Sequence, residues 1–193
     1  MGFEAISALG RTLGFSFAAG INLYATVAIL GLASKNDWVA LPEQFQAFNN
    51  DWVIGAAAVM YVIEFFADKI PYVDTVWDMI HTAIRPIGGA LIAVTTLGEA
   101  SPGTMGMAAL LGGAVAAGSH LTKTSTRAAA NTSPEPFSNW ALSLGEDAFV
   151  VGLAYLALQY PVAAMLVVIV ALALIILFAA IILRMVRRWF ARV

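Results

Sequence analysis

The stretch from Val162 to Leu183 contains no charged and no polar side chain, and this feature constrains the fold more than any other. It is longer than the roughly 20 residues that an α-helix needs to cross about 30 Å of hydrocarbon. Of the 193 residues, 61% are hydrophobic and 11% are charged, whereas about 25% are charged in ordinary soluble domains. A water-soluble fold of this size cannot bury so much apolar surface, so the sequence predicts an integral membrane protein.

Apolar runs of comparable length recur along the chain, separated by prolines and polar segments. They lie at about 9–33, 52–68, 75–97, 104–131, 140–158 and 162–186. No shift in composition marks a second domain. We therefore expect residues 1–193 to form a single all-α domain, a polytopic membrane bundle of about six transmembrane helices.

Basic residues predict the orientation of these helices. Arg184, Arg187 and Arg188 directly follow the last apolar run, and basic residues beside a span mark its cytoplasmic side. An even number of crossings then places the N-terminus in the cytoplasm as well. The expected outer loop at 34–51 is rich in acidic residues, which fits this orientation.

A segment of the first half of the chain is repeated in the second half. LGFSFAAGINLYAT, at 13–26, recurs 98 residues later as LGGAVAAGSHLTKT, at 111–124. With an odd number of crossings per half, the second copy enters the membrane from the opposite side, as in many secondary transporters. We therefore expect a 3+3 inverted repeat with halves at about 8–98 and 103–190. Alternatively, these small residues merely let two helices pack closely.

The first helix of each half carries glycines near its middle, and we expect it to be broken there. The backbone groups freed by the breaks would lie around Gly20 and Asn22 in the first half, and around Gly118 and Ser119 in the second. Non-helical backbone at membrane depth must face a cavity or other protein, where it can bind ions. Straight helices with close glycine packing are the alternative.

The span at 75–97 and its N-terminal edge carry ionisable side chains spaced i, i+4, i+7 and i+11, which share one helical face. These residues are Asp74, Asp78, His81 and Arg85. An unpaired charge at the bilayer centre costs about 2.5 to 3.5 kcal/mol, so Arg85 needs a partner. Glu64 and Asp68, which are four residues apart in the preceding span, are the candidates.

Two later spans add ionisable residues. His120, Lys123 and Arg127 lie in a polar run of the fourth span. Glu146 and Asp147 are adjacent in the fifth span, and adjacent helical residues point about 100° apart, so we expect Glu146 alone to face the interior. The candidate residues of a transport pathway are Glu64, Asp68, Asp78, His81, Arg85, His120, Lys123, Glu146 and Asp147.

These charges have a structural interpretation beside the functional one. Interhelical ion pairs can simply hold the register of the helices. Residues near span ends can also extend to the lipid head groups, which is what we expect of Asp68, Lys69, Asp74 and Arg127. For the deeper residues we favour function, because ionisable side chains inside a membrane usually mark ion or substrate pathways.

The sequence offers little support for catalysis. It has no cysteine, and it lacks the HExxH and GxSxG patterns, so we predict no catalytic residue, no metal site and no cofactor. The two histidines, His81 and His120, lie on different spans. No basic patch typical of nucleic-acid binding is present in the sequence.

The segments AAGINLYAT, EFFADKIPYVDTVWD, AIRPIGGAL and AAGSHLTKTSTRAAANTSPEP together resemble a family of bacterial integral-membrane proteins catalogued only as a domain of unknown function. The resemblance covers nearly the whole chain. It implies a multi-pass protein of the bacterial cytoplasmic (inner) membrane. It carries no established activity and no assigned site residues.

Taken together, these features predict a small transporter or channel-like protein. In this hypothesis Glu64, Asp78 and Glu146 bind a cation or pass protons, while Arg85 and His81 adjust their charge. The expected partners are the lipid bilayer, an unidentified ion or small molecule, and further copies of the chain packed through small-residue faces. Two alternatives remain: a structural or interaction protein locked by ion pairs, and a lipid-headgroup enzyme using His120, Lys123 and Arg127.

Overall fold

The computed structural model describes residues 2–39, 41–132 and 137–190. The last four residues of AAGSHLTKTSTRAAANTSPEP therefore lie outside the described residues. The described part is helical and contains no strand. In order, its elements are α1 (Gly2–Ile21), α2 (Leu23–Lys35), η1 (Glu43–Phe48), α3 (Asp51–Ala67), α4 (Pro71–Leu97), α5 (Pro102–Ala130), α6 (Phe137–Gln159) and α7 (Pro161–Phe190).

Four of these helices, α4, α5, α6 and α7, are long and apolar enough to cross a membrane. The predicted all-helical, multi-pass character is therefore confirmed at this level. The first predicted span, 9–33, is divided between α1 and α2, and the second coincides with α3.

Prolines and polar caps set the helix boundaries. Pro71, Pro102 and Pro161 begin α4, α5 and α7, where the missing N–H of proline costs no intrahelical hydrogen bond. The side chain of Asn50 accepts hydrogen bonds from the first backbone amides of α3, and that of Ser101 accepts from an amide of α5.

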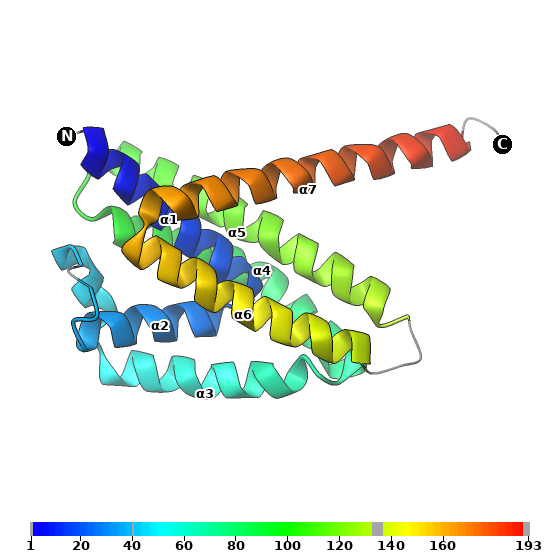
Figure 1. Cartoon of the computed structure of the whole chain (residues 1–193), viewed down its shortest axis with the longest axis horizontal. Helices are drawn as coiled ribbons and strands as arrows, with labels where there is room; N and C mark the ends of the chain where they lie inside the picture. Colours follow the sequence, from blue (N-terminus) through cyan, green and yellow to red (C-terminus); the bar gives the residue numbers. More distant parts are fainter. Residues whose placement is uncertain (1, 40, 133–136, 191–193) are drawn as a thin grey trace.

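Helix α1 lies at the centre of the bundle and packs against α4, α5, α6 and α7 (Figure 1). Its residues from Thr12 to Gly20 are all buried. The adjacent pair α4 and α5 approach closely through glycines, since a Cβ atom on Gly112 would lie 2.7 Å from the carbonyl oxygen of Gly89. Such contacts are the usual basis of helix association in membranes.

Helix α7 buries few of its side chains in the bundle. Ala164 and Val168 are its buried residues among the described ones, and its C-terminal half extends away from the other helices in Figure 1. Its apolar surface therefore suits contact with lipid, as expected for the last span.

The predicted break in the first span is present, and it lies at Asn22. This residue has extended backbone angles, φ −145° and ψ 98°, and its side-chain oxygen accepts a hydrogen bond from the amide of Ala25 at 2.9 Å. Asn22 therefore ends α1 and caps α2. Gly20, where we also expected broken backbone, is within α1.

The predicted break in the second half is wrong, because α5 continues through Gly118 and Ser119. Ser119 donates its hydroxyl hydrogen bond to backbone carbonyls of Ala116 and Phe17. The position equivalent to Asn22 is His120, whose ring nitrogens lie within hydrogen-bonding distance of Arg85 and Thr82. No capping side chain therefore competes with the helix at this point.

Candidate functional site

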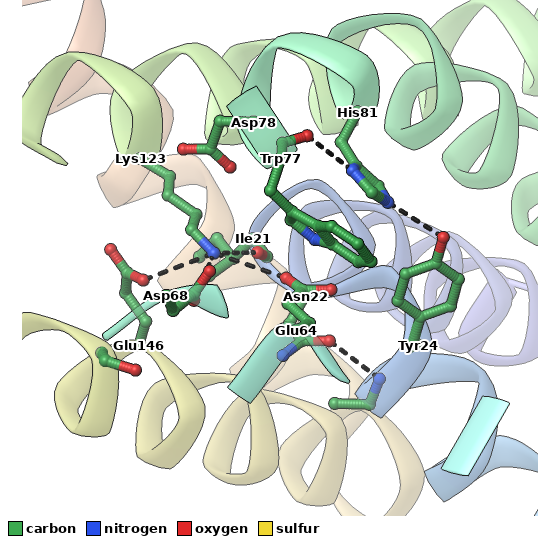
Figure 2. Close-up of polar contacts among 12 residues, drawn as sticks. Ile21, Asn22, Tyr24, Glu64, Asp68, Trp77, Asp78, His81, Lys123 and Glu146 are labelled. Atoms are coloured by element: carbon green, nitrogen blue, oxygen red, sulfur yellow. Dashed lines mark hydrogen bonds and ion pairs between the residues drawn. The ribbon is translucent and has the colours of Figure 1, made fainter. Parts of the chain in front are cut away.

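A cluster of ionisable side chains, most of them buried, lies around the break between α1 and α2. Its members come from α3 with the turn after it, and from α4, α5 and α6, so these segments converge on one region (Figure 2). We call this set the charge cluster: Glu64, Asp68, Asp74, Asp78, Arg85, Lys123, Arg127, Glu146 and Asp147. The four predicted residues on one face of α4 are all buried.

Arg85 and Glu64 form the deepest ion pair. The guanidinium Nη2 atom lies 2.7 Å from Glu64 Oε1, and both side chains are completely buried. Nη1 donates to the carbonyl oxygen of Gly20 at 3.3 Å and lies 3.4 Å from Asp78 Oδ1. Of the two predicted partners of Arg85, Glu64 is confirmed, whereas Asp68 binds other cations.

His120, rather than His81, contacts Arg85. Its Nδ1 atom accepts a hydrogen bond from Nη1 at 2.9 Å, since a guanidinium can only donate. His81 instead lies within hydrogen-bonding distance of the Tyr24 hydroxyl, at 2.9 Å, and of the Trp77 carbonyl, at 2.7 Å (Figure 2). The predicted partnership of His81 with Arg85 is thus not a direct contact.

Lys123 lies between four oxygen atoms. Its Nζ atom is 2.8 Å from Asp68 Oδ2, 3.3 Å from the carbonyl oxygen of Ile21 and 3.4 Å from Glu64 Oε1. The fourth oxygen, Glu146 Oε2, is 3.6 Å away. The lysine side chain is 1% exposed, so water does not replace these contacts.

Arg127 binds the carboxylates nearest the end of the bundle. Its guanidinium donates to both oxygens of Glu146, at 2.7 to 3.2 Å, and to Asp68 Oδ2 at 3.1 Å. It also donates to Asn139 Oδ1 at 3.2 Å. Arrangements in which a guanidinium binds both oxygens of a carboxylate are among the strongest charged hydrogen bonds in proteins.

The expectation that residues at span ends extend to the head groups is wrong for Asp68, Asp74 and Arg127, which are buried. Their mutual pairing removes the need to reach water. Lys69 is half-buried in the turn between α3 and α4, and its ammonium donates to the Phe65 carbonyl at 2.9 Å. Burial lowers the pKa of Lys69 from its usual value.

Both acidic residues of α6 are engaged. Glu146 faces Arg127 and Lys123, as predicted. Asp147 also has a partner, because its Oδ1 atom accepts a hydrogen bond from Asn22 Nδ2 at 3.1 Å. The expectation that Glu146 alone faces the interior is therefore wrong, because both side chains contact polar groups inside the bundle.

The break supplies backbone acceptors to the cluster. In a continuous helix the amide of Ala25 would bond the carbonyl of Ile21, but here it donates to the side chain of Asn22. The carbonyl of Ile21 instead accepts from Lys123, and that of Gly20 accepts from Arg85. The predicted backbone ligands therefore exist in the first half, and the chain's own cations occupy them.

The cluster contains more carboxylates than cations. Six carboxylates, Glu64, Asp68, Asp74, Asp78, Glu146 and Asp147, face the three cations Arg85, Lys123 and Arg127, and adding Lys69 still leaves an excess of carboxylates. Five of the six carboxylates have one buried oxygen without a hydrogen-bond partner within the described residues. These atoms are Glu64 Oε2, Asp68 Oδ1, Asp74 Oδ1, Asp78 Oδ1 and Asp147 Oδ2.

A polar cleft of about 330 Å³ between α4 and α5 leads to one side of the cluster. Asp74, Asp78 and Arg127 line it together with the hydroxyl groups of four serine and threonine residues. Glu64, Arg85 and Glu146 are not part of its lining. The cleft therefore contacts the charge cluster through Asp74, Asp78 and Arg127.

Three polar residues at the site were not predicted. Asn131, at the end of α5, donates to Asp74 Oδ2 at 3.0 Å, Asn139 accepts from Arg127, and Tyr24 contacts His81. Asparagine and tyrosine are ordinary residues at helix ends and membrane interfaces. The sequence positions of Asn131 and Asn139 do not distinguish them from such residues, whereas Tyr24 lies near the middle of the predicted span 9–33.

Comparison with known proteins identifies a family but no characterised relative. No curated protein and no solved structure matches the chain. The model of one family, described as a domain of unknown function (DUF4126), matches residues 9–180, which include all four segments that carry the resemblance seen in the sequence. The chain therefore belongs to the DUF4126 family.

Proposed function

We propose that this chain is a small membrane transporter that moves protons or small cations along a polar pathway through the charge cluster. The proposal rests mainly on one observation, the excess of carboxylates over cations in the charge cluster, of which four carboxylates and three cations are buried. An uncompensated negative charge is costly in a medium of low dielectric constant. A bound proton or cation removes that cost, so the cluster is suited to take up positive charge.

Carboxylate oxygens that accept no hydrogen bond support the same proposal. A protonated carboxylic acid carries its proton on one oxygen and keeps acceptor capacity on the other. Asp78 Oδ1 accepts no hydrogen bond within the described residues, although it lies at ion-pair distance from Arg85, and Asp78 also lines the polar cleft. Through its 3.4 Å contact with Arg85 it is linked to Glu64, so it connects the cleft with the deepest ion pair.

The proposed architecture is a 3+3 inverted repeat of six crossings in the bacterial inner membrane, with both termini in the cytoplasm. In the first half α1 with α2, then α3 and α4, make the crossings, and in the second half α5, α6 and α7 do. The repeated segment supports this arrangement, and so does the break at Asn22 beside the charge cluster. Broken helices at the midplane are typical of transporters built in this way.

The proposal assigns no enzymatic reaction to the chain. A lipid phosphate would need free cationic donors, but Lys123 and Arg127 are buried and bound to carboxylates. The proposal also includes homo-oligomerisation through small-residue faces, with the number of copies open.

The test is proton and cation flux into liposomes containing the purified protein. We expect Asp78→Asn to lower flux by about tenfold or more, because a neutral amide can neither bind nor release a proton. Asp51→Asn is the matched control, since Asp51 is 76% exposed and pairs with Lys35 at the surface.

Unchanged flux in a folded Asp78→Asn protein would contradict the pathway. The ion pairs of the charge cluster would then only hold the helices in register.

A further inference from the structure

The surroundings of Lys123 have the chemistry of a cation site. Four oxygen atoms from the end of α3, from α6 and from the helix break surround its ammonium at 2.8 to 3.6 Å. We call them the oxygen cage: Asp68 Oδ2, Glu64 Oε1, Glu146 Oε2 and the carbonyl oxygen of Ile21. Figure 2 shows the lysine nitrogen in the middle of these groups.

Two features indicate that the cage is more than a set of ion pairs. The carbonyl of Ile21 is available to it because Asn22 takes the amide that would otherwise bond it. In addition, the second oxygens of Glu64 and Asp68 are buried without hydrogen-bond partners, although these residues are 0% and 2% exposed. The cage therefore has acceptor capacity beyond the three donors of an ammonium group.

We infer that the oxygen cage is a binding site for a monovalent cation about the size of ammonium, and that Lys123 is a tethered occupant that competes with that cation. This inference rests on the proposed function and names its ion site. Ammonium, methylammonium and potassium belong to the class of ligand that the site would take.

The distances in the cage argue against a divalent ion. Ca²⁺ binds six to eight oxygens at about 2.3 to 2.6 Å, and Mg²⁺ binds them at about 2.0 to 2.1 Å. The cage oxygens lie 2.8 to 3.6 Å from Lys123 Nζ, and these distances suit a larger cation of lower charge.

Asp78 provides a second position for the lysine ammonium. Its side chain lines the cleft, and Figure 2 shows its carboxylate beside the lysine side chain without a drawn contact. Lysine has a flexible four-carbon stem. When a cation enters the cage, the ammonium moves to Asp78, and each carboxylate group keeps one positive neighbour.

The experiment is cation-dependent thermal stability of Lys123→Ala, purified in detergent and measured at constant ionic strength. Removing the ammonium leaves the cage open, so ammonium, methylammonium or potassium chloride should raise the Tm saturably above that in N-methyl-D-glucamine chloride. The wild-type protein should need about tenfold more salt for the same rise, because its own lysine competes.

Lys69→Ala is the matched control. Its ammonium contacts a backbone carbonyl and the Ser143 hydroxyl, so its removal opens no carboxylate cage and should produce no cation-specific rise. Adding Glu64→Gln to Lys123→Ala should weaken the response, because it removes one charged oxygen from the cage.

Lys123→Gln keeps most of the side-chain volume and serves if the alanine variant does not fold. The inference is overturned if neither Lys123 variant shows a saturable, cation-specific rise, or if Lys69→Ala responds equally. The thermal-stability experiment measures binding without transport, so the two proposals can fail separately. If Asp78→Asn loses flux but the Lys123 variants show no cation-specific rise in Tm, the cation site is refuted and the proposed function stands.

Discussion

Asn22 and His120 occupy equivalent positions in the two copies of the repeated segment, yet the helix ends at the first and continues through the second. The asparagine side chain offers its oxygen to the amide of Ala25 and so stabilises an extended backbone. The histidine ring turns toward Arg85 instead. At equivalent positions, one side chain therefore caps a new helix and the other binds a cation of the cluster.

The two similar segments therefore contribute different groups to the charge cluster. The broken helix of the first half presents the carbonyls of Gly20 and Ile21, which are acceptors. The continuous helix of the second half presents Lys123 and Arg127, which are donors, and the equivalent positions in the first copy are Ala25 and Ile29. Two segments that are similar in sequence are thus complementary in chemistry.

The largest expected effect comes from removing a donor that the second half alone possesses. Arg127→Met leaves the buried carboxylate of Asp68 and the largely buried carboxylate of Glu146 without their guanidinium, and should lower the free energy of unfolding by about 3 to 5 kcal/mol. The equivalent change in the first half, Ile29→Met, exchanges one apolar side chain for another and should cost less than about 1.5 kcal/mol. Unfolding by sodium dodecyl sulfate titration measures both, and similar losses would refute the complementarity of the halves.

A smaller effect should distinguish the two glycines of the repeat. A Cβ atom on Gly20 would overlap Ser119 Oγ and the carbonyl of Ala116, so Gly20→Ala should destabilise the protein by about 1 to 3 kcal/mol. Gly118 has Leu172 at an ordinary 3.8 Å, and alanine favours a helix, so Gly118→Ala should stabilise by about 0.5 to 1 kcal/mol. Thermal unfolding in detergent gives both signs. A loss of stability in Gly118→Ala would mean that this glycine also serves a close approach.

The smallest effect concerns the cap at the break. Asn22→Ala removes the acceptor of the Ala25 amide, and should lower stability by about 1 kcal/mol. It also removes the donor to Asp147. Asn36→Ala, at the exposed end of the same helix, should change stability by no more than about 0.5 kcal/mol. Hydrogen exchange of the first amides of α2 reports the cap directly, and unchanged exchange in Asn22→Ala would exclude it.

Much of the site was predictable because helical spacing is a local property. The common face of Asp74, Asp78, His81 and Arg85 follows from residues three and four apart, and the structure buries all four together. The need of Arg85 for a carboxylate follows from the cost of an isolated charge in hydrocarbon, and Glu64 meets that need.

Other contacts could not be predicted in the same way. Asp68, Asp74 and Arg127 lie near helix ends, where head groups are within reach of a single helix considered by itself. They are buried because α4 and α5 pack side by side. Asn139, near the start of α6, then contacts Arg127, and Asn131, at the end of α5, contacts Asp74. Such positions depend on how the helices meet.

By itself, the sequence determined that this protein is helical, that it is apolar enough for several membrane crossings, and that its charges gather on particular helix faces. These properties depend on composition and on residues within a few turns of one another. Only the tertiary structure decided that the backbone breaks at Asn22 and not at Gly118, and that Lys123 lies among oxygens from α3, α6 and the break. Those outcomes involve contacts between residues as far as 125 positions apart, such as Asn22 with Asp147, which no local pattern encodes.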